Sequence, residues 1–113
     1  MKKVEAVIRP DSLDEVMGAL EGAGYPGIMV TEIEGHGRQK GVKQQWRGQE
    51  YKVDLLPKVK IEVVVTDKEA DEIIKSISKV AKTGQVGDGK IFLTDVSDAV
   101  RIRTGERGDS ALN

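Results

Sequence analysis

The pattern that most constrains this fold is a strand, helix and strand unit that occurs twice along the chain. In the first unit, alternating residues over 3–9 and 28–34 predict half-buried strands, and a helical period predicts a helix over about 10–23. In the second unit, the strands fall at 58–65 and 90–96, and an apolar stripe from Ala70 to Ala81 predicts a helix that ends at Gly84. This duplication predicts a ferredoxin-like βαββαβ fold of the α+β class, with two helices on one face of the sheet.

Local signals mark the ends of these elements. Two pairs have the spacing of a capping box, Ser12 with Glu15 and Thr66 with Glu69. A short fifth strand is predicted over 100–104, followed by a flexible tail over about 105–113 that has little apolar content. A ferredoxin-like fold serves many unrelated functions, so the functional argument must come from the sites.

Length and composition narrow the class of protein. The 113 residues fit a single domain, 1–113, and the absence of cysteine excludes disulfides and thiolate metal sites. We therefore expect a cytoplasmic protein, because no stretch resembles a signal peptide or a membrane helix. The formal net charge of -1 removes the electrostatic case for general nucleic-acid binding, so any basic feature must be local.

A long connection separates the second and third predicted strands, over about 37–55. A hairpin needs only about 2–5 residues, so a connection of this length is typical of a functional loop or of a disordered insertion. The segment contains Trp46 and Tyr51, where no core periodicity would bury them, and its basic residues outnumber its acidic ones. We interpret it as an interaction loop for a partner with acidic or phosphate groups, and an unstructured insertion is the alternative.

A second loop, over about 83–90, is rich in glycine. It matches the string G-x-x-x-x-G-K, but Ile91 replaces the Ser or Thr of a P-loop, and the order is helix, loop, strand. Gly87 and Gly89 permit backbone N–H groups to converge on an anion, and Lys90 adds a positive charge. The segment is therefore a candidate phosphate-binding loop, and a plain turn is the alternative.

Arg101 and Arg103 form a second cationic cluster. Two residues apart on a strand, they would project from one face and could grip phosphate oxygens together. Taken alone, the pair is better explained by a solvated charged strand, but a second cationic cluster in a nearly neutral chain raises the odds of a nucleotide site.

Several blocks of residues at matching spacing resemble the P-II signal-transduction proteins of nitrogen regulation. The resemblance covers essentially the whole chain and rests on Gly35–Gly41, Arg47-Gly48, Glu50-Tyr51, Leu56–Glu62, Thr83-Gly84, Gly87–Phe92 and Arg101–Glu106.

The resemblance implies a homotrimer with ATP or ADP in the clefts between subunits. Phosphates would lie near the loop, and Met29 and Val64 would line the adenine. The full set of implied nucleotide-binding residues is Met29, Gly37, Arg38, Val64, Gly87, Asp88, Gly89, Lys90, Arg101 and Arg103. Met29 stands where many relatives have Thr, which removes one hydroxyl partner for the adenine.

The resemblance also implies that 2-oxoglutarate binds beside ATP and Mg²⁺. Gln39 would be a metal ligand, Lys58 would pair with a carboxylate, and the backbone of Gln39, Lys40 and Gly41 would hold the rest. Residues 42–46 replace the usual centre of the loop, so a sensor of nucleotide alone, which has lost 2-oxoglutarate, is the alternative.

Family members bind ammonium transporters, which implies recruitment to the inner face of the membrane. Trp46, Arg47 and Tyr51 would form the partner-binding part of the loop, with Arg47 suited to enter a transporter pore. Glutamine synthetase or another nitrogen-assimilation enzyme is a second candidate partner. Tyr51 matches a position that is uridylylated in some relatives, and a partner pocket alone would also explain it.

Two other classes of function have less support. An enzyme is poorly supported, because the sequence shows no recognisable nucleophile beside a base: the chain has one histidine, His36, and no cysteine. Glu62 and Asp88 could orient water near a nucleotide, so slow ATP hydrolysis is conceivable as a side activity. An RNA-binding reading would require stacking aromatics on the central strands, and 3–9 and 58–65 contain none.

Overall fold

The computed structural model describes residues 1–25, 27–36, 43–46, 49–52 and 55–112, and for 43–46 and 49–52 it describes only the course of the backbone. The elements follow in the order β1 (Lys2–Ile8), η1 (Pro10–Ser12), α1 (Leu13–Gly22), β2 (Met29–His36), β3 (Lys43–Trp46), β4 (Gln49–Lys52), β5 (Leu55–Val65), α2 (Asp67–Ala81), β6 (Lys90–Asp95) and η2 (Gly108–Leu112).

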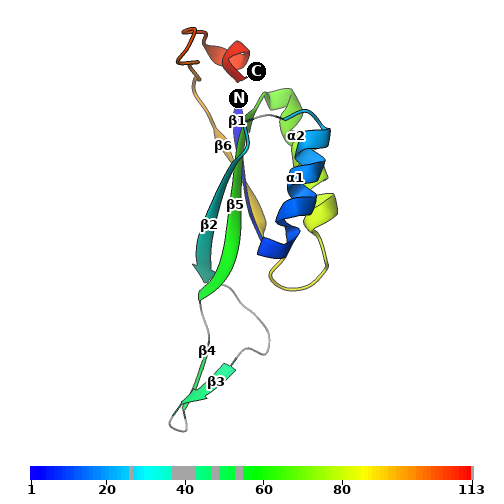
Figure 1. The fold of residues 1–113 in the computed structure, drawn as a ribbon, viewed down its shortest axis with the longest axis vertical. Helices are drawn as coiled ribbons and strands as arrows, with labels where there is room; N and C mark the ends of the chain where they lie inside the picture. Colours follow the sequence, from blue (N-terminus) through cyan, green and yellow to red (C-terminus); the bar gives the residue numbers. More distant parts are fainter. Residues whose placement is uncertain (26, 37–42, 47–48, 53–54, 113) are drawn as a thin grey trace.

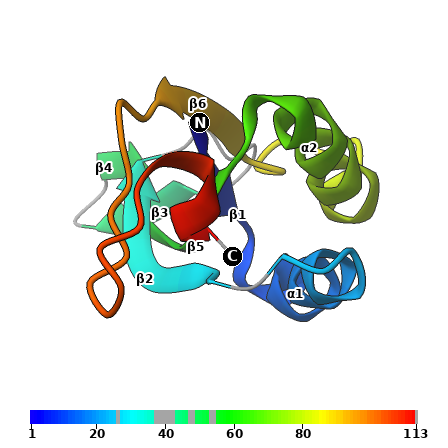
Figure 2. The same ribbon diagram turned by 90° about the horizontal axis from the view of Figure 1, so that it is seen from above.

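Four strands form the main sheet, in the order β2-β5-β1-β6, and every neighbouring pair is antiparallel. Both α1 and α2 lie on the same side of this sheet (Figures 1 and 2). The two predicted units are therefore interleaved, since the first and third predicted strands, β1 and β5, occupy the centre. This topology confirms the ferredoxin-like prediction.

The core lies between the helices and one face of the sheet. Alternate residues of β1 and β5 point into it, from Val4 at 0% exposed to Val59 at 4%. Val16 and Leu20 of α1 and Ile73 and Ile77 of α2 pack against them and are almost fully buried. The alternate residues of the strands and the apolar stripes of the helices thus form one apolar layer. We call the face of the sheet that lies beneath the helices the covered face.

The two helices begin differently. Thr66 and Glu69 form the predicted capping box, and the Glu69 carboxylate accepts the Thr66 hydroxyl at 2.6 Å and its backbone N–H at 3.3 Å. The capping box predicted at Ser12 and Glu15 is wrong. Ser12 ends a 3₁₀ turn with helical dihedrals and makes no side-chain cap, because Pro10 starts the turn and moves the helix entry two residues earlier.

The long connection contains more regular structure than the sequence pattern predicts. β3 and β4 pair antiparallel, with Lys43 opposite Lys52 and Trp46 opposite Gln49. Figure 1 shows this ribbon beyond the ends of β2 and β5, away from both helices. β5 itself begins at Leu55, earlier than the predicted strand at 58.

The predicted fifth strand over 100–104 is also wrong. Only Val100 makes a bridge, to Arg107, and the chain between them turns back on itself. The Gly105 N–H donates to the Arg101 carbonyl at 2.7 Å, and the Arg101 N–H donates to the Glu106 carbonyl at 2.8 Å. Gly105 has φ +76°, a conformation that a continuing strand cannot contain and that glycine adopts readily.

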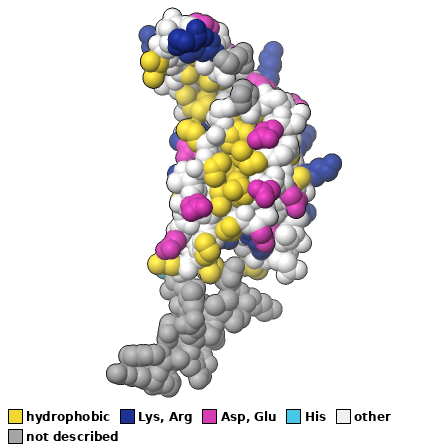
Figure 3. Space-filling view, in the orientation of Figure 1, with side chains coloured by type: hydrophobic (Ala, Val, Ile, Leu, Met, Phe, Trp, Pro, Cys, Tyr) yellow, Lys and Arg dark blue, Asp and Glu magenta, His cyan; other side chains and the backbone are white. Residues whose placement is uncertain are grey.

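The second face of the sheet carries no helix, and we call it the bare face. On β1 and β5 it presents mixed charges, and Lys60 and Lys3 reach the Glu62 carboxylate at 3.2 and 3.7 Å. Large hydrophobic side chains also remain at the surface of the described residues, namely Met29, Val30, Leu55, Val86, Phe92, Leu93, Val100 and Ile102. Figure 3 shows hydrophobic side chains gathered on one side of the molecule between acidic ones.

Candidate functional site

The Gly-rich loop connects the end of α2 to the start of β6. Lys82 leaves the helix with extended dihedrals, and three glycines, Gly84, Gly87 and Gly89, then take positive φ values of 86°, 101° and 106°. Such values strain any residue with a Cβ, so the glycine pattern seen in the sequence has a conformational cause.

Gly89 also has a packing cause. A Cβ built at this position would overlap the carbonyl oxygen of Val7 and would come within 3.2 Å of Ile8 Cα. The loop therefore lies directly against the backbone of β1. A side chain at position 89 would push it off the sheet.

Two basic side chains hold the carbonyl groups of the loop. Arg9 Nη2 donates to the Val86 carbonyl at 2.6 Å, and Lys58 Nζ donates to the Gly87 carbonyl at 2.9 Å. Arg9 lies just after β1 and Lys58 lies on β5, so they tie the loop to the two central strands of the sheet. In a trans peptide the N–H points opposite to its carbonyl, so these two contacts also fix where the following N–H groups point.

Asp88 ties the end of the loop to its beginning. Its carboxylate accepts the backbone N–H groups of Thr83 and Gly84, each at 2.9 Å, together with the Thr83 hydroxyl. Arg9 Nη2 lies 3.3 Å from the same carboxylate. The Thr83 hydroxyl and N–H, followed by the Gly84 N–H and the Arg9 guanidinium, hold the pKa of Asp88 below its usual range.

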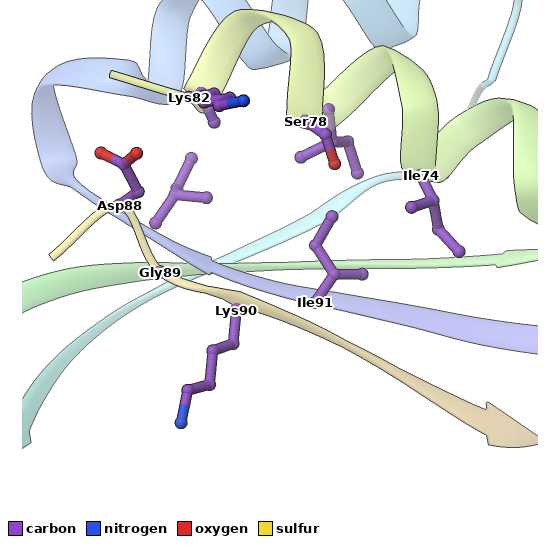
Figure 4. A pocket seen from close by; sticks show the side chains of 10 residues that line it. Ile74, Ser78, Lys82, Asp88, Gly89, Lys90 and Ile91 are labelled. Carbon is purple, nitrogen blue, oxygen red and sulfur yellow. The ribbon is translucent and has the colours of Figure 1, made fainter. Parts of the chain in front are cut away.

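A cleft of about 810 Å³ opens beside the loop on the bare face. Its wall consists of β2 and β5 residues on one side and the loop on the other, and it is lined by Val7, Gly35, His36, Leu56, Lys58, Gln85, Val86, Gly87, Asp88, Gly89, Lys90 and Phe92. Figure 4 shows Lys90 pointing away from α2, while Asp88 and Lys82 lie on the α2 side. Two lysines, Lys58 and Lys90, and one carboxylate, that of Asp88, therefore contribute charge to the lining of the cleft.

The other described residues that are predicted to bind nucleotide lie further along the sheet than Lys58. Val64 is six residues along β5 from Lys58, which corresponds to roughly 20 Å at ~3.3 Å per residue. Met29 pairs with Glu62, four residues along β5 from Lys58. Arg101 and Arg103 lie beyond the far end of β6, and Arg101 contacts the Glu106 carboxylate at 3.2 Å and the Ser110 carbonyl at 3.1 Å. One chain thus carries the predicted site residues as two separated groups.

The remaining predicted site residues belong to the long loop. Gly37, Arg38, Gln39, Lys40, Gly41 and Arg47 lie outside the described residues. Trp46 and Tyr51 lie on β3 and β4, where only the backbone is described.

Arg9 is the main site residue that the sequence reasoning missed. The sequence did indicate its position. Arg9 alternates with Val7 and Glu5 and so belongs to the same face of the sheet, and continuing the β1·β5 register by one residue places it opposite Lys58. Thr83 was part of the glycine-rich string, but nothing in one sequence indicates that its hydroxyl reaches Asp88.

No group of three or more His, Asp or Glu side chains in the described ranges could hold a metal ion. No helix among those residues is both long and apolar enough to cross a membrane.

The fold and the cleft together define a ferredoxin-like α+β domain with a glycine-rich loop and two lysines at one end of its bare face. Comparison with known proteins then gives the family. The family model described as nitrogen regulatory protein P-II matches residues 1–106.

Individual relatives agree with that match. The chain is 56% identical over 112 residues to the nitrogen regulatory protein P-II of Azospirillum brasilense and 54% identical over 112 residues to that of Rhizobium meliloti. Each alignment covers 99% of this chain and 100% of the relative. It is 53% identical to nitrogen regulatory protein P-II 2 of Methanothermobacter thermautotrophicus, over 99% of this chain and 97% of the relative. The chain belongs to the nitrogen regulatory protein P-II family.

Proposed function

We propose that this chain is a non-catalytic signal transducer that binds ATP or ADP, with phosphates against the Gly-rich loop. The observation that carries the proposal is the convergence of Lys58, Lys90 and the loop backbone on one cleft of the bare face, in a chain of the P-II family. Cations and glycine-rich backbone are the groups that bind phosphates in other nucleotide sites.

The separation of the predicted residues supports assembly into a homotrimer. The strand register places Lys90 level with Lys60, so Val64 lies four residues further along the sheet, and Arg103 lies beyond the far end of β6; one nucleotide would have to span this length to touch all three in the same chain. A neighbouring copy could supply these residues, along with Met29 and Arg101. The exposed hydrophobic side chains of β2, β6 and the C-terminal segment give such an interface apolar contacts.

We propose that 2-oxoglutarate is the effector, bound beside ATP and its Mg²⁺. Gln39 would coordinate the metal, and Lys58 would pair with a carboxylate. A specific observation favours the alternative of a nucleotide-only sensor, since Lys58 Nζ already donates to the Gly87 carbonyl at 2.9 Å. An effector would have to replace this hydrogen bond, which lowers its net gain.

The proposed partner is an ammonium transporter, with glutamine synthetase or another nitrogen-assimilation enzyme as the second candidate. The protein would work in the cytoplasm and move to the membrane with its partner. Trp46, Arg47 and Tyr51 carry this part of the proposal, because aromatic and arginine side chains anchor many interfaces. Replacing Trp46 and Arg47 by Ala should abolish co-purification with the transporter and leave ATP affinity unchanged.

Calorimetry tests the nucleotide proposal directly. ATP, ADP and adenosine are titrated into the protein, and 2-oxoglutarate is titrated into the free, ADP-loaded and MgATP-loaded protein. We expect ATP and ADP to bind far more tightly than adenosine, and 2-oxoglutarate to bind only with MgATP. Linkage then requires 2-oxoglutarate to tighten MgATP by the same factor.

Two results would separate the candidates. Nucleotide binding without any response to 2-oxoglutarate would establish the nucleotide-only sensor. Equal affinities for ATP and adenosine would refute a phosphate-binding loop, and ATP turnover at a steady rate would refute a non-catalytic role.

A further inference from the structure

Asp88 is one of the residues that line the cleft, but its carboxylate is engaged by donors of the loop itself. Figure 4 shows this carboxylate on the α2 side of the loop, whereas Lys90 points to the opposite side. A carboxylate that faced the cleft would also repel a phosphate. Asp88 nevertheless gathers four donor contacts, from the Thr83 N–H and hydroxyl, the Gly84 N–H and the Arg9 guanidinium.

These contacts close the loop into a ring. Thr83 and Gly84 stand at its start and Asp88 at its end, so one carboxylate joins the two ends across four or five residues. The Thr83 hydroxyl strengthens the ring by also accepting the Gln85 N–H at 3.1 Å. A segment with this many glycines has a large conformational entropy, which such a closure reduces.

Arg9 attaches the ring to the sheet. The same Nη2 atom lies 3.3 Å from the Asp88 carboxylate and 2.6 Å from the Val86 carbonyl. A single guanidinium thus contacts both the ring's carboxylate and its backbone. Its place at the end of β1 fixes the loop relative to Lys58 on the neighbouring strand.

We propose that Asp88 and Arg9 are positioning residues, which hold the loop from behind so that its N–H groups and Lys90 meet the nucleotide phosphates in a preformed arrangement. The inference rests on the proposed function, and it gives the Asp88 carboxylate a role without direct contact with the nucleotide. Preorganisation of this kind raises affinity because less ordering entropy is lost on binding.

Three variants test the inference. Asp88→Asn keeps the shape but removes the charge and one acceptor, and Thr83→Val removes only the hydroxyl from the same ring. Asp95→Asn is the matched control, because Asp95 also pairs with a basic residue, Lys2, but at the far end of β6. Thr83→Ser keeps the hydroxyl and should behave as the unchanged protein.

The first measurement is amide hydrogen exchange of residues 84–87 in the protein without nucleotide. We expect exchange roughly tenfold faster in Asp88→Asn and in Thr83→Val, and no change in Asp95→Asn or Thr83→Ser. The second is calorimetry, in which Asp88→Asn should weaken ATP roughly tenfold and leave adenosine unaffected. An effect on overall folding alone would change both ligands together.

The outcomes distinguish the two proposals. Unchanged loop exchange in Asp88→Asn and Thr83→Val overturns the positioning role, whatever the nucleotide results. Faster loop exchange with unchanged ATP affinity overturns it as well. If the unaltered protein binds no ATP, the proposed function fails, and the inference that depends on it fails too. Should Asp88→Asn not fold, Thr83→Val provides the same two measurements.

Discussion

The two faces of the sheet, built from the same strands, have opposite characters. On the covered face, Val59, Ile61 and Val63 of β5 are almost fully buried beneath the helices. On the bare face, the residues that alternate with them, Lys58, Lys60 and Glu62, form ion pairs or reach the loop.

The difference follows from a period of two. Successive side chains of a strand point to opposite faces, so one eleven-residue strand can build a dry core and a charged surface together. Stability then depends on the covered face, and under the proposed function phosphate binding depends on the bare face and the loop beside it. The comparison predicts that substitutions on the two faces have different kinds of effect.

The largest effect is expected on the covered face. Ile61→Ala removes a side chain that is 1% exposed, so we expect a loss of about 2–5 kcal/mol of unfolding free energy from the cavity and the lost burial. Its neighbour on the bare face is the matched control, and Lys60→Gln should cost less than about 1 kcal/mol. Denaturant unfolding measures both. Equal losses of unfolding free energy in the two variants would contradict the claim that stability depends mainly on the covered face.

Gly89→Ala should give the next largest effect, because it forces the loop off β1. Both a positive φ and an overlap with the Val7 carbonyl oppose the added Cβ, and we expect a loss of about 2–3 kcal/mol. Gly84→Ala isolates the cost of the positive φ, since Gly84 also has a positive φ but nothing lies within 4 Å of its Cβ position. It should cost about 1 kcal/mol. A Gly84 variant as unstable as the Gly89 variant would show that packing against β1 is unimportant.

The smallest effect is a local dependence on pH. The contacts of Asp88 lower its pKa in the folded loop, so their contribution is present above the ordinary aspartate pKa of about 3.9. It is lost as the pH falls through the lowered value. Carboxyl and loop amide NMR shifts, followed from neutral pH to about 2, should move together at that pKa. The amide transition should be absent in Asp88→Asn. Its persistence there would assign it to another group.

Strong periodicity made most of the fold predictable. Alternation in 58–65 and the apolar stripe of 70–81 predicted β5 and α2, and two such units fixed the topology. The errors occurred where local signals were weak. The 3₁₀ turn at Pro10 removed the cap at Ser12, and the turn at Gly105 replaced a strand whose only support was alternation over five residues.

The site was predictable in composition but not in arrangement. Glycine spacing and Lys90 marked the loop, because positive φ and a cation leave a trace in the sequence. The contacts of Arg9 with Val86 and Asp88 join residues that are 77 and 79 positions apart, and the direction of the Asp88 side chain depends on the folded loop. Neither feature is encoded in a local stretch of the sequence. Nothing in the alternation indicated that β3 and β4 would pair.

Lys82 and Lys90 give the most direct test of the central claim that nucleotide chemistry belongs to the bare face. Both lysines flank the same loop, but they lie on opposite sides of it (Figure 4). A charge-assisted phosphate contact is worth about 1.5–3 kcal/mol, so Lys90→Ala should weaken ATP roughly ten- to a hundredfold, while Lys82→Ala should leave its affinity unchanged. The measurement is an ATP titration of both variants by calorimetry. Equal weakening by the two substitutions, or an effect of Lys82→Ala alone, would contradict the account.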